Sequence, residues 1–242
     1  MLLRPMIRQD IDRRAIVLII LSSQYKAHFA LWAAIKSPLL MGNDLRQLSA
    51  KDLSILNNPA IIALNQDPLG KSVVRVQRNK HVKKDKYGIG ETQVWSGPLF
   101  GGDQAVILVN AADEDVEISV GLDEIFVFDG PGGSAPQVQQ EWELYDLWAD
   151  RMDEKLAEQI LDADVETARK LLNKANWYNS TAIPYKDGLK HGDDRLFGRK
   201  VGTVQAKGQL TKKVRKHAAE VYRLKAVGEG AKRKEQHHQT EL

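Results

Sequence analysis

Short runs of β-branched and aromatic residues follow one another after Gly70, and this repetition constrains the fold more than any other feature of the sequence. Turn residues separate the runs at Gly101–Asp103 and Gly130–Gly133, and such clusters are typical of reversals between antiparallel strands. The expected strands are Val73–Val76, Gln93–Trp95, Ala105–Val109, Val116–Val120, Ile125–Phe128, Lys200–Val204 and Ala219–Leu224. An antiparallel β-sandwich is therefore predicted, with one or two surface helices inserted between residues 153 and 175.

The sequence before Gly70 has helical spacing instead. Apolar side chains recur every three or four residues from Tyr25 to Lys36, and Pro38 prevents the helix from continuing. Leu39–Met41 is a short apolar run that predicts a buried strand. The pair Ser49 and Asp52 resembles a capping box and predicts a helix, followed by a second apolar segment at Ile61–Leu64. This part of the chain is predicted to be α/β.

The apolar run Ala15–Leu21 resembles the core of a secretory signal superficially. It follows Asp10 and Asp12 and is far shorter than the roughly 20 residues needed to cross a membrane. We interpret it as the start of a buried strand or helix, and we predict no membrane association. Short signal cores do occur, so a cryptic signal stays an open alternative.

Composition excludes several kinds of site. The 242 residues contain no cysteine, which rules out disulfides, thiolate catalysis and Cys-ligated metals. The 35 basic and 32 acidic residues give a net charge of +3, too even a balance to predict nucleic-acid binding across the whole surface. Asn179-Ser180-Thr181 is an acceptor pattern for N-glycosylation. The polar sequence after Leu224 is expected to be a disordered tail.

Five stretches carry a family resemblance. The eighteen residues His28–Leu45 closely resemble a signature of glycoside hydrolase family 27, and Asn65–Gly70 and Val94–Leu99 continue it. Asp129–Val138 and Tyr145–Trp148 are similar to the fungal α-galactosidases of that family. The resemblance implies an α/β part followed by an all-β part. The first is the last helix–strand–helix units of a (β/α)₈ TIM barrel, and the second is an antiparallel β-sandwich. In this alignment Tyr25–Ser37 would be the seventh barrel helix and Pro38–Met41 the eighth strand.

The resemblance also implies the chemistry. Family members hydrolyse terminal α-galactosides without a cofactor, through a covalent intermediate that needs two carboxyl groups about 5 Å apart. The aspartates that play these roles in the family precede the matched stretch and have no counterpart here. Asp10 and Asp12 are the local carboxylates, and their surroundings match neither motif. We therefore assign no catalytic residue and no metal site, and we expect this chain to be inactive by itself.

Other residues are candidates for lesser roles. Asn43 and Asp44 follow the expected last barrel strand, where barrel enzymes bind substrate, although Asp44 is more simply explained as the cap of the next turn. Met41 and Trp32 are expected in the core, and His28 is expected to pack on its helix. His237-His238 lacks further metal ligands at a useful spacing. A basic cluster needs no function beyond that of a solvated loop: Arg75, Arg78, Lys80, His81, Lys83, Lys84 and Lys86.

Two main hypotheses follow. The first is a barrel remnant at 1–70, a β domain at 71–224 and a tail at 225–242, acting on galactoside oligosaccharides as part of a secreted α-galactosidase. The second is a non-catalytic β module that binds carbohydrate or a partner chain. Binding of nucleic acid through residues 75–86 is a weaker third alternative. Because one strand cannot close a barrel, Phe29, Trp32, Leu39 and Leu40 are expected to be exposed and to favour self-association.

Overall fold

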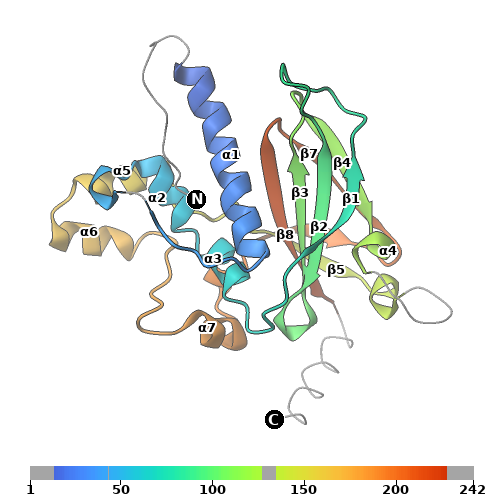
Figure 1. The fold of residues 1–242 in the computed structure, drawn as a ribbon. Coiled ribbons are helices and arrows are strands. Elements are labelled where there is room, and N and C mark those ends of the chain that lie inside the picture. Colours follow the sequence, from blue (N-terminus) through green and yellow to red (C-terminus); the bar gives the residue numbers. More distant parts are fainter. Residues whose placement is uncertain (1–13, 43, 127–134, 228–242) are drawn as a thin grey trace.

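A computed structural model describes residues 14–42, 44–126 and 135–227 (Figure 1). Helices cover one face of a large sheet, and a pair of strands covers the other. The α-helices are α1 Arg14–Ala34, α2 Ala50–Leu56, α3 Pro59–Asn65, α4 Leu122–Ile125, α5 Glu154–Asp162, α6 Val165–Leu172 and α7 Tyr185–His191. The strands are β1 Val74–Asn79, β2 Thr92–Pro98, β3 Gln104–Asn110, β4 Val116–Gly121, β5 Trp142–Asp146, β6 Arg199–Val204, β7 Gln209–Val214 and β8 Ala218–Ala226.

The sheet has six strands in the order β1-β2-β3-β8-β5-β6, with antiparallel neighbours throughout. Strands β4 and β7 form a separate antiparallel pair. The chain crosses between the two sheets after β3, and Figure 1 shows the β4–β7 pair lying across the larger sheet. The predicted sandwich is therefore confirmed.

Alternation along β3 explains why both faces of the large sheet are covered. Val106 and Leu108 point into the core shared with β4 and β7, whereas Ala105 and Ile107 pack against the helices. All four side chains are fully buried. A strand buried on both faces reads as a continuous apolar run, because successive side chains point to opposite sides.

Helix α1 packs on the sheet through small and aromatic side chains. Ala30 and Ala33 have no exposed surface, and Phe29 is 8% exposed in a cluster that includes Ile107 and Val221. The expectation that Phe29 would be exposed is wrong, because the sheet supplies the apolar neighbours that a closed barrel would otherwise provide. Trp32 is half-buried and stacks at a tilt on exposed His28, with 4.6 Å between ring centres.

The predicted strand Leu39–Met41 does not form. A strand needs a hydrogen-bonded neighbour, and in the described part of the chain no strand lies beside this segment. Leu40 and Met41 are 80% and 56% exposed, so the prediction that Met41 lies in the core is also wrong. Leu39 is partly buried against α1 and its neighbours.

Helices α2 and α3 begin where their capping residues predict. The Ser49 side chain accepts a hydrogen bond from the Asp52 backbone N–H, and Asn58 accepts from Ala60 and Ile61. Asn58 is 1% exposed, and its amide also donates to the Leu147 carbonyl at 2.9 Å. This side chain therefore joins the start of α3 to the end of β5.

A buried polar contact lies at the junction of the helical segment and the sandwich. Asp67 accepts a hydrogen bond from the Phe100 backbone N–H at 2.9 Å, which fixes the end of the helical segment to the β2–β3 connection. In the same connection, Asp103 accepts from Arg223 Nε of β8 at 2.7 Å. The guanidinium of Arg223 stacks on Phe197, 4.4 Å from the ring centre. Both ends of the β2–β3 connection are thus held by charged side chains.

The structure corrects the sequence analysis in the second half of the chain. Ile125 ends helix α4, so the strand predicted at Ile125–Phe128 is wrong where it is described, and residues 127 and 128 lie outside the described part. Strands β5 and β7 and helix α7 were not predicted. Two helices, α5 and α6, occupy the expected helical segment. Most of the expected tail, including His237-His238, lies outside the described residues.

Candidate functional site

A cleft of about 200 Å³ opens where strand β5 leaves β8. Pairing between these strands ends at Asp146 and Tyr222, but β8 continues back to Ala218. The chain after Asp146 turns away toward Arg151 and leaves a gap beside β8. Ser23 and Lys26 of α1 line another side of this gap. The cleft is therefore a consequence of the unequal lengths of two paired strands.

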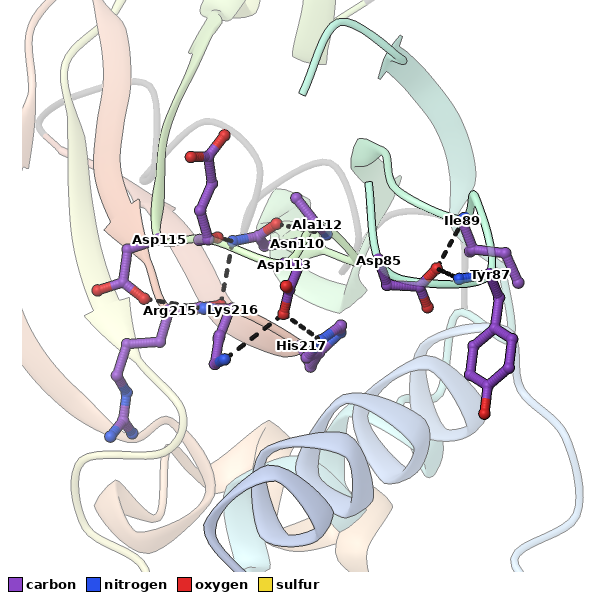
Figure 2. A network of polar contacts seen from close by, with 11 residues as sticks. Asp85, Tyr87, Ile89, Asn110, Ala112, Asp113, Asp115, Arg215, Lys216 and His217 are labelled. Atoms are coloured by element: carbon purple, nitrogen blue, oxygen red, sulfur yellow. Dashed lines mark hydrogen bonds and ion pairs between the residues drawn. The ribbon is translucent and has the colours of Figure 1, made fainter. Parts of the chain in front are cut away.

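Five charged side chains line this cleft. Lys26 comes from α1, Arg151 from the segment after β5, Arg215 from the β7–β8 turn, Asp146 from the end of β5 and Glu220 from β8. Figure 2 shows the Arg215 side chain directed away from the network formed by its neighbours in the turn. Charged groups from three stretches of the chain, at residue 26, residues 146–151 and residues 215–220, thus meet at one place.

Burial changes the acidity of these groups. Burial, and then the charges of Arg151 and Arg215, lower the pKa of the Lys26 ammonium to about 8. Burial raises the pKa of Asp146, against the hydrogen bond that it accepts from the Trp148 backbone N–H. Burial, and then the charge of Asp146, raise the pKa of Glu220. Clustered shifts of this kind are typical of functional sites, although structural ion clusters also produce them.

Two buried N–H groups of residues that line the cleft have no hydrogen-bond partner within the described residues. They are Nε1 of Trp148, a residue that is 5% exposed, and Nε of Arg151. Lys26 Nζ lies over the Trp148 ring, 5.7 Å from its centre. Unpaired buried donors are rare in folded proteins and call for a specific explanation.

The substrate-binding candidates lie elsewhere. Asn43 is outside the described residues, and Asp44 is exposed at the start of a short 3₁₀ turn, Leu45–Gln47. The Asp44 carboxylate accepts from the Arg46 backbone N–H at 3.1 Å and pairs with the Arg46 guanidinium at 2.9 Å. Asp44 therefore caps the turn that follows it. Asp44 is not among the residues that line the cleft.

Several residues of the basic cluster make local contacts. Arg75 and Arg78 lie in β1, and the other five residues lie in the β1–β2 loop rather than all in a loop as expected. Arg78 pairs with Glu91 at 2.6 Å, and Arg75 lies over the Trp95 ring. The loop is anchored where the Lys83 backbone N–H donates to Glu114.

A polar network closes the same end of the sandwich (Figure 2). Asp113 lies 3.5 Å from Lys216 Nζ and 3.6 Å from His217 Nε2, and the Lys216 charge lowers the pKa of Asp113. The Asn110 amide donates to the carbonyls of Val214 and Arg215. These contacts fix the β7–β8 turn, and with it the position from which Arg215 reaches the cleft.

Sequence reasoning did not find the cleft. Trp148 entered only as part of a family motif, and Lys26, Arg151 and Arg215 are ordinary surface residues by sequence. One local signal exists, because Glu220 interrupts the apolar strand Ala218–Leu224. Among the described residues, no group of three or more His, Cys, Asp or Glu side chains could hold a metal ion. No helix in the described ranges is both long and apolar enough to cross a membrane.

The helical segment and the β-sandwich each match a family model of the α-galactosidases. Residues 7–67 match the family model "Alpha galactosidase A", and residues 89–169 match "Alpha galactosidase C-terminal beta sandwich domain". An α-galactosidase from Zygotorulaspora mrakii is 42% identical over 200 residues, which is 83% of this chain and 41% of that protein. The chain therefore spans less than half the length of the curated relatives it matches.

Solved structures extend the likeness to three dimensions. The α-galactosidase of Saccharomyces cerevisiae, solved with raffinose, has a TM-score of 0.76 and 38% identity, over 85% of this chain and 44% of that one. α-Galactosidase I from Mortierella vinacea has a TM-score of 0.53 and 23% identity, over 84% of this chain and 35% of its own, and supports the fold alone. Partial barrel and β-sandwich thus both have counterparts. The chain belongs to the α-galactosidase family, glycoside hydrolase family 27, and corresponds to its C-terminal part.

Proposed function

We propose that this chain is the C-terminal portion of an α-galactosidase and serves in the hydrolysis of terminal, non-reducing α-D-galactosyl residues of oligosaccharides. The observation that carries the proposal is the double match: the helical segment and the sandwich each match the family, in the family's order. A β module unrelated to catalysis would give no reason for the first match.

We further propose that the 242-residue chain does not catalyse this reaction alone. A retaining glycosidase needs a nucleophile and an acid/base about 5 Å apart across the scissile bond. Asp146 and Glu220 share a cleft, but they belong to the sandwich. One oxygen of Asp146 accepts a backbone hydrogen bond from Trp148 at 2.8 Å. Neither carboxylate lies in a stretch that resembles a catalytic motif of the family.

A chimera tests the proposal. The region of the Saccharomyces cerevisiae enzyme that matches this chain would be replaced by this chain, and release of p-nitrophenol from p-nitrophenyl α-galactoside would be measured. We expect turnover by the chimera and none by the chain alone, with p-nitrophenyl β-galactoside as the negative control. A chimera that is folded by circular dichroism but inactive would contradict the proposal, and so would turnover by the chain alone.

The same chimera tests the candidates Asn43 and Asp44 as substrate-binding residues. Asp44→Ala removes both the carboxylate and the cap, whereas Arg46→Ala removes only the ion pair. A rise in KM confined to Asp44→Ala would support contact with substrate. An equal change in KM in both variants would show that only the ion pair matters. The KM of Asn43→Ala is compared with those of the same two variants.

We also propose the division into a barrel remnant at 1–70, a β domain at 71–224 and a tail at 225–242, with the boundary near Gly70, whose φ is +65°. Secretion is part of the proposal, because the relatives belong to a family of glycosidases that act on galactosides and because Asn179 is exposed. We also propose that the chain self-associates through the exposed segment around Leu40.

A further inference from the structure

Trp177 lies in the connection between α6 and α7 and is half-buried. Within the described residues it belongs to none of the three apolar clusters, and its ring stacks on no other aromatic ring. Part of a large aromatic surface is therefore left uncovered by the chain itself. The other four tryptophans each pack in a cluster or stack on a ring: Trp32, Trp95, Trp142 and Trp148.

Trp177 precedes Asn179, the acceptor of the glycosylation pattern, by two residues. Tyr178 between them is 5% exposed and packs with Leu189 and Phe197, whereas Asn179 is exposed. Such alternation is that of an extended segment, in which residues two apart point to the same side. Trp177 and Asn179 thus share the side that faces solvent, and their Cα atoms are at most about 7 Å apart.

Hydrogen bonds hold this segment in place on both sides of Tyr178. The Trp177 carbonyl accepts from Arg195 Nη1 at 3.4 Å, and the Arg195 guanidinium lies over the Tyr178 ring, 5.1 Å from its centre. The Asn179 side-chain oxygen accepts from the Thr181 backbone N–H at 3.2 Å, an Asx turn. The turn occupies the carboxamide oxygen and leaves the nitrogen Nδ2, the atom that carries an N-linked glycan, available for modification.

We propose that the first N-acetylglucosamine of a glycan on Asn179 packs on the open face of Trp177. In the modification Nδ2 loses a proton and bonds to C1 of the sugar, and a lipid-linked diphosphate donor releases its diphosphate. The face of an indole ring is electron-rich and attracts C–H groups, and one side of the pyranose presents them. The glycan therefore covers the apolar surface and fixes the α6–α7 connection.

The inference rests on the proposed secretion of the chain and not on the hydrolysis of α-galactosides. It makes Trp177 a positioning residue for the glycan. The two parts are separable, because occupancy of Asn179 is read from mass and the contact is read from stability.

Calorimetric melting of the full chain tests the contact. The chain is secreted from yeast and trimmed with endoglycosidase H to a single N-acetylglucosamine. Residues 179–181 form the only acceptor pattern in the sequence, so Asn179→Gln provides the form without sugar. We expect the sugar to raise Tm by about 2–4 °C. In Trp177→Leu, which keeps an apolar side chain but no ring, the sugar should raise Tm by less than about 1 °C.

Trp177→Phe is the matched control, because it keeps an aromatic face and should keep most of the gain in Tm. Each variant is compared with and without the sugar, so the cost of the substitution itself cancels. In NMR spectra, protons of the sugar should show nuclear Overhauser contacts to the Trp177 ring. An equal gain in Tm in Trp177→Leu and the unmodified chain, or absence of those contacts, would refute the packing. A secreted chain whose mass endoglycosidase H leaves unchanged would overturn the inference at its first step, and the chimera assay of hydrolysis would be unaffected.

Discussion

The ion pair between Asp103 and Arg223 offers the sharpest test of how the sandwich is held together. The two side chains are 10% and 3% exposed, and the Asp103 carboxylate accepts from Arg223 Nε at 2.7 Å. Arg223 cannot give up its proton. Asp103→Ala therefore leaves a buried, unpaired guanidinium, and we expect a loss of about 3–5 kcal/mol in the free energy of unfolding.

The opposite variant should behave differently. Arg223→Met leaves Asp103 without its cation, but a carboxyl group can take up a proton. Burial already raises the pKa of Asp103 against the effect of Arg223. A raised folded-state pKa means that the native state holds its proton more tightly than the unfolded chain, so stability falls as pH rises through the folded pKa. The deficit of Arg223→Met should therefore be smaller at pH 5 than at pH 8.

The double variant completes the cycle. Replacing both charges with apolar side chains removes the desolvation cost together with the attraction, so Asp103→Ala/Arg223→Met should lie within about 1 kcal/mol of the unmodified chain. Urea denaturation followed by tryptophan fluorescence gives each free energy by linear extrapolation. A cost below about 1 kcal/mol for Asp103→Ala, or a double variant equal to the sum of the singles, would refute the reasoning.

Two further predictions concern the surface. Leu40, Met41 and Leu45 are 80%, 56% and 62% exposed, and an exposed apolar patch favours association. We therefore expect the chain to sediment above its monomer mass in analytical ultracentrifugation. The double variant Leu40→Asp/Met41→Asp should restore the monomer. A chain that is already monomeric would contradict this. Asn179 is exposed in an acceptor pattern, so the chain secreted from yeast should lose apparent mass on endoglycosidase treatment. The same treatment should leave Asn179→Gln unchanged.

Local patterns predicted the elements that carry their own signal. The apolar run of β3 and the cap of α2 at Ser49 each specify their structure from adjacent residues, and both are predicted from the sequence. The cap of α3 at Asn58 is not. Strand β5 has an alternating pattern, with Trp142 and Leu144 buried. Only its last two residues, Tyr145 and Asp146, enter the sequence analysis, as part of a family motif. Strand β7 was missed because consecutive lysines conceal its two buried residues, Leu210 and Val214.

The predictions from sequence fail where the structure depends on residues that are far apart in the chain. Leu39–Met41 has the composition of a buried strand, yet no described strand pairs with it. The cleft depends on where β5 stops relative to β8, and that register is invisible in either strand alone. Its residues come from positions as far apart as Lys26 and Glu220. A charged residue within an apolar strand is the one local sign that such a site could leave.

The helices before Gly70 are not separable from the sandwich that follows them. Ala105, Ile107, Ala219 and Val221 form an apolar face of the large sheet. Helix α1 covers this face, and α3 packs against α1 in the same apolar cluster. Apolar surface costs about 25 cal/mol per Å² when it is returned to water, so uncovering this face would lower the free energy of unfolding of the sandwich. A β module consisting of residues 71–224 alone would expose that face. The helical segment, whatever its role in a complete barrel, is therefore part of what makes this sandwich stable.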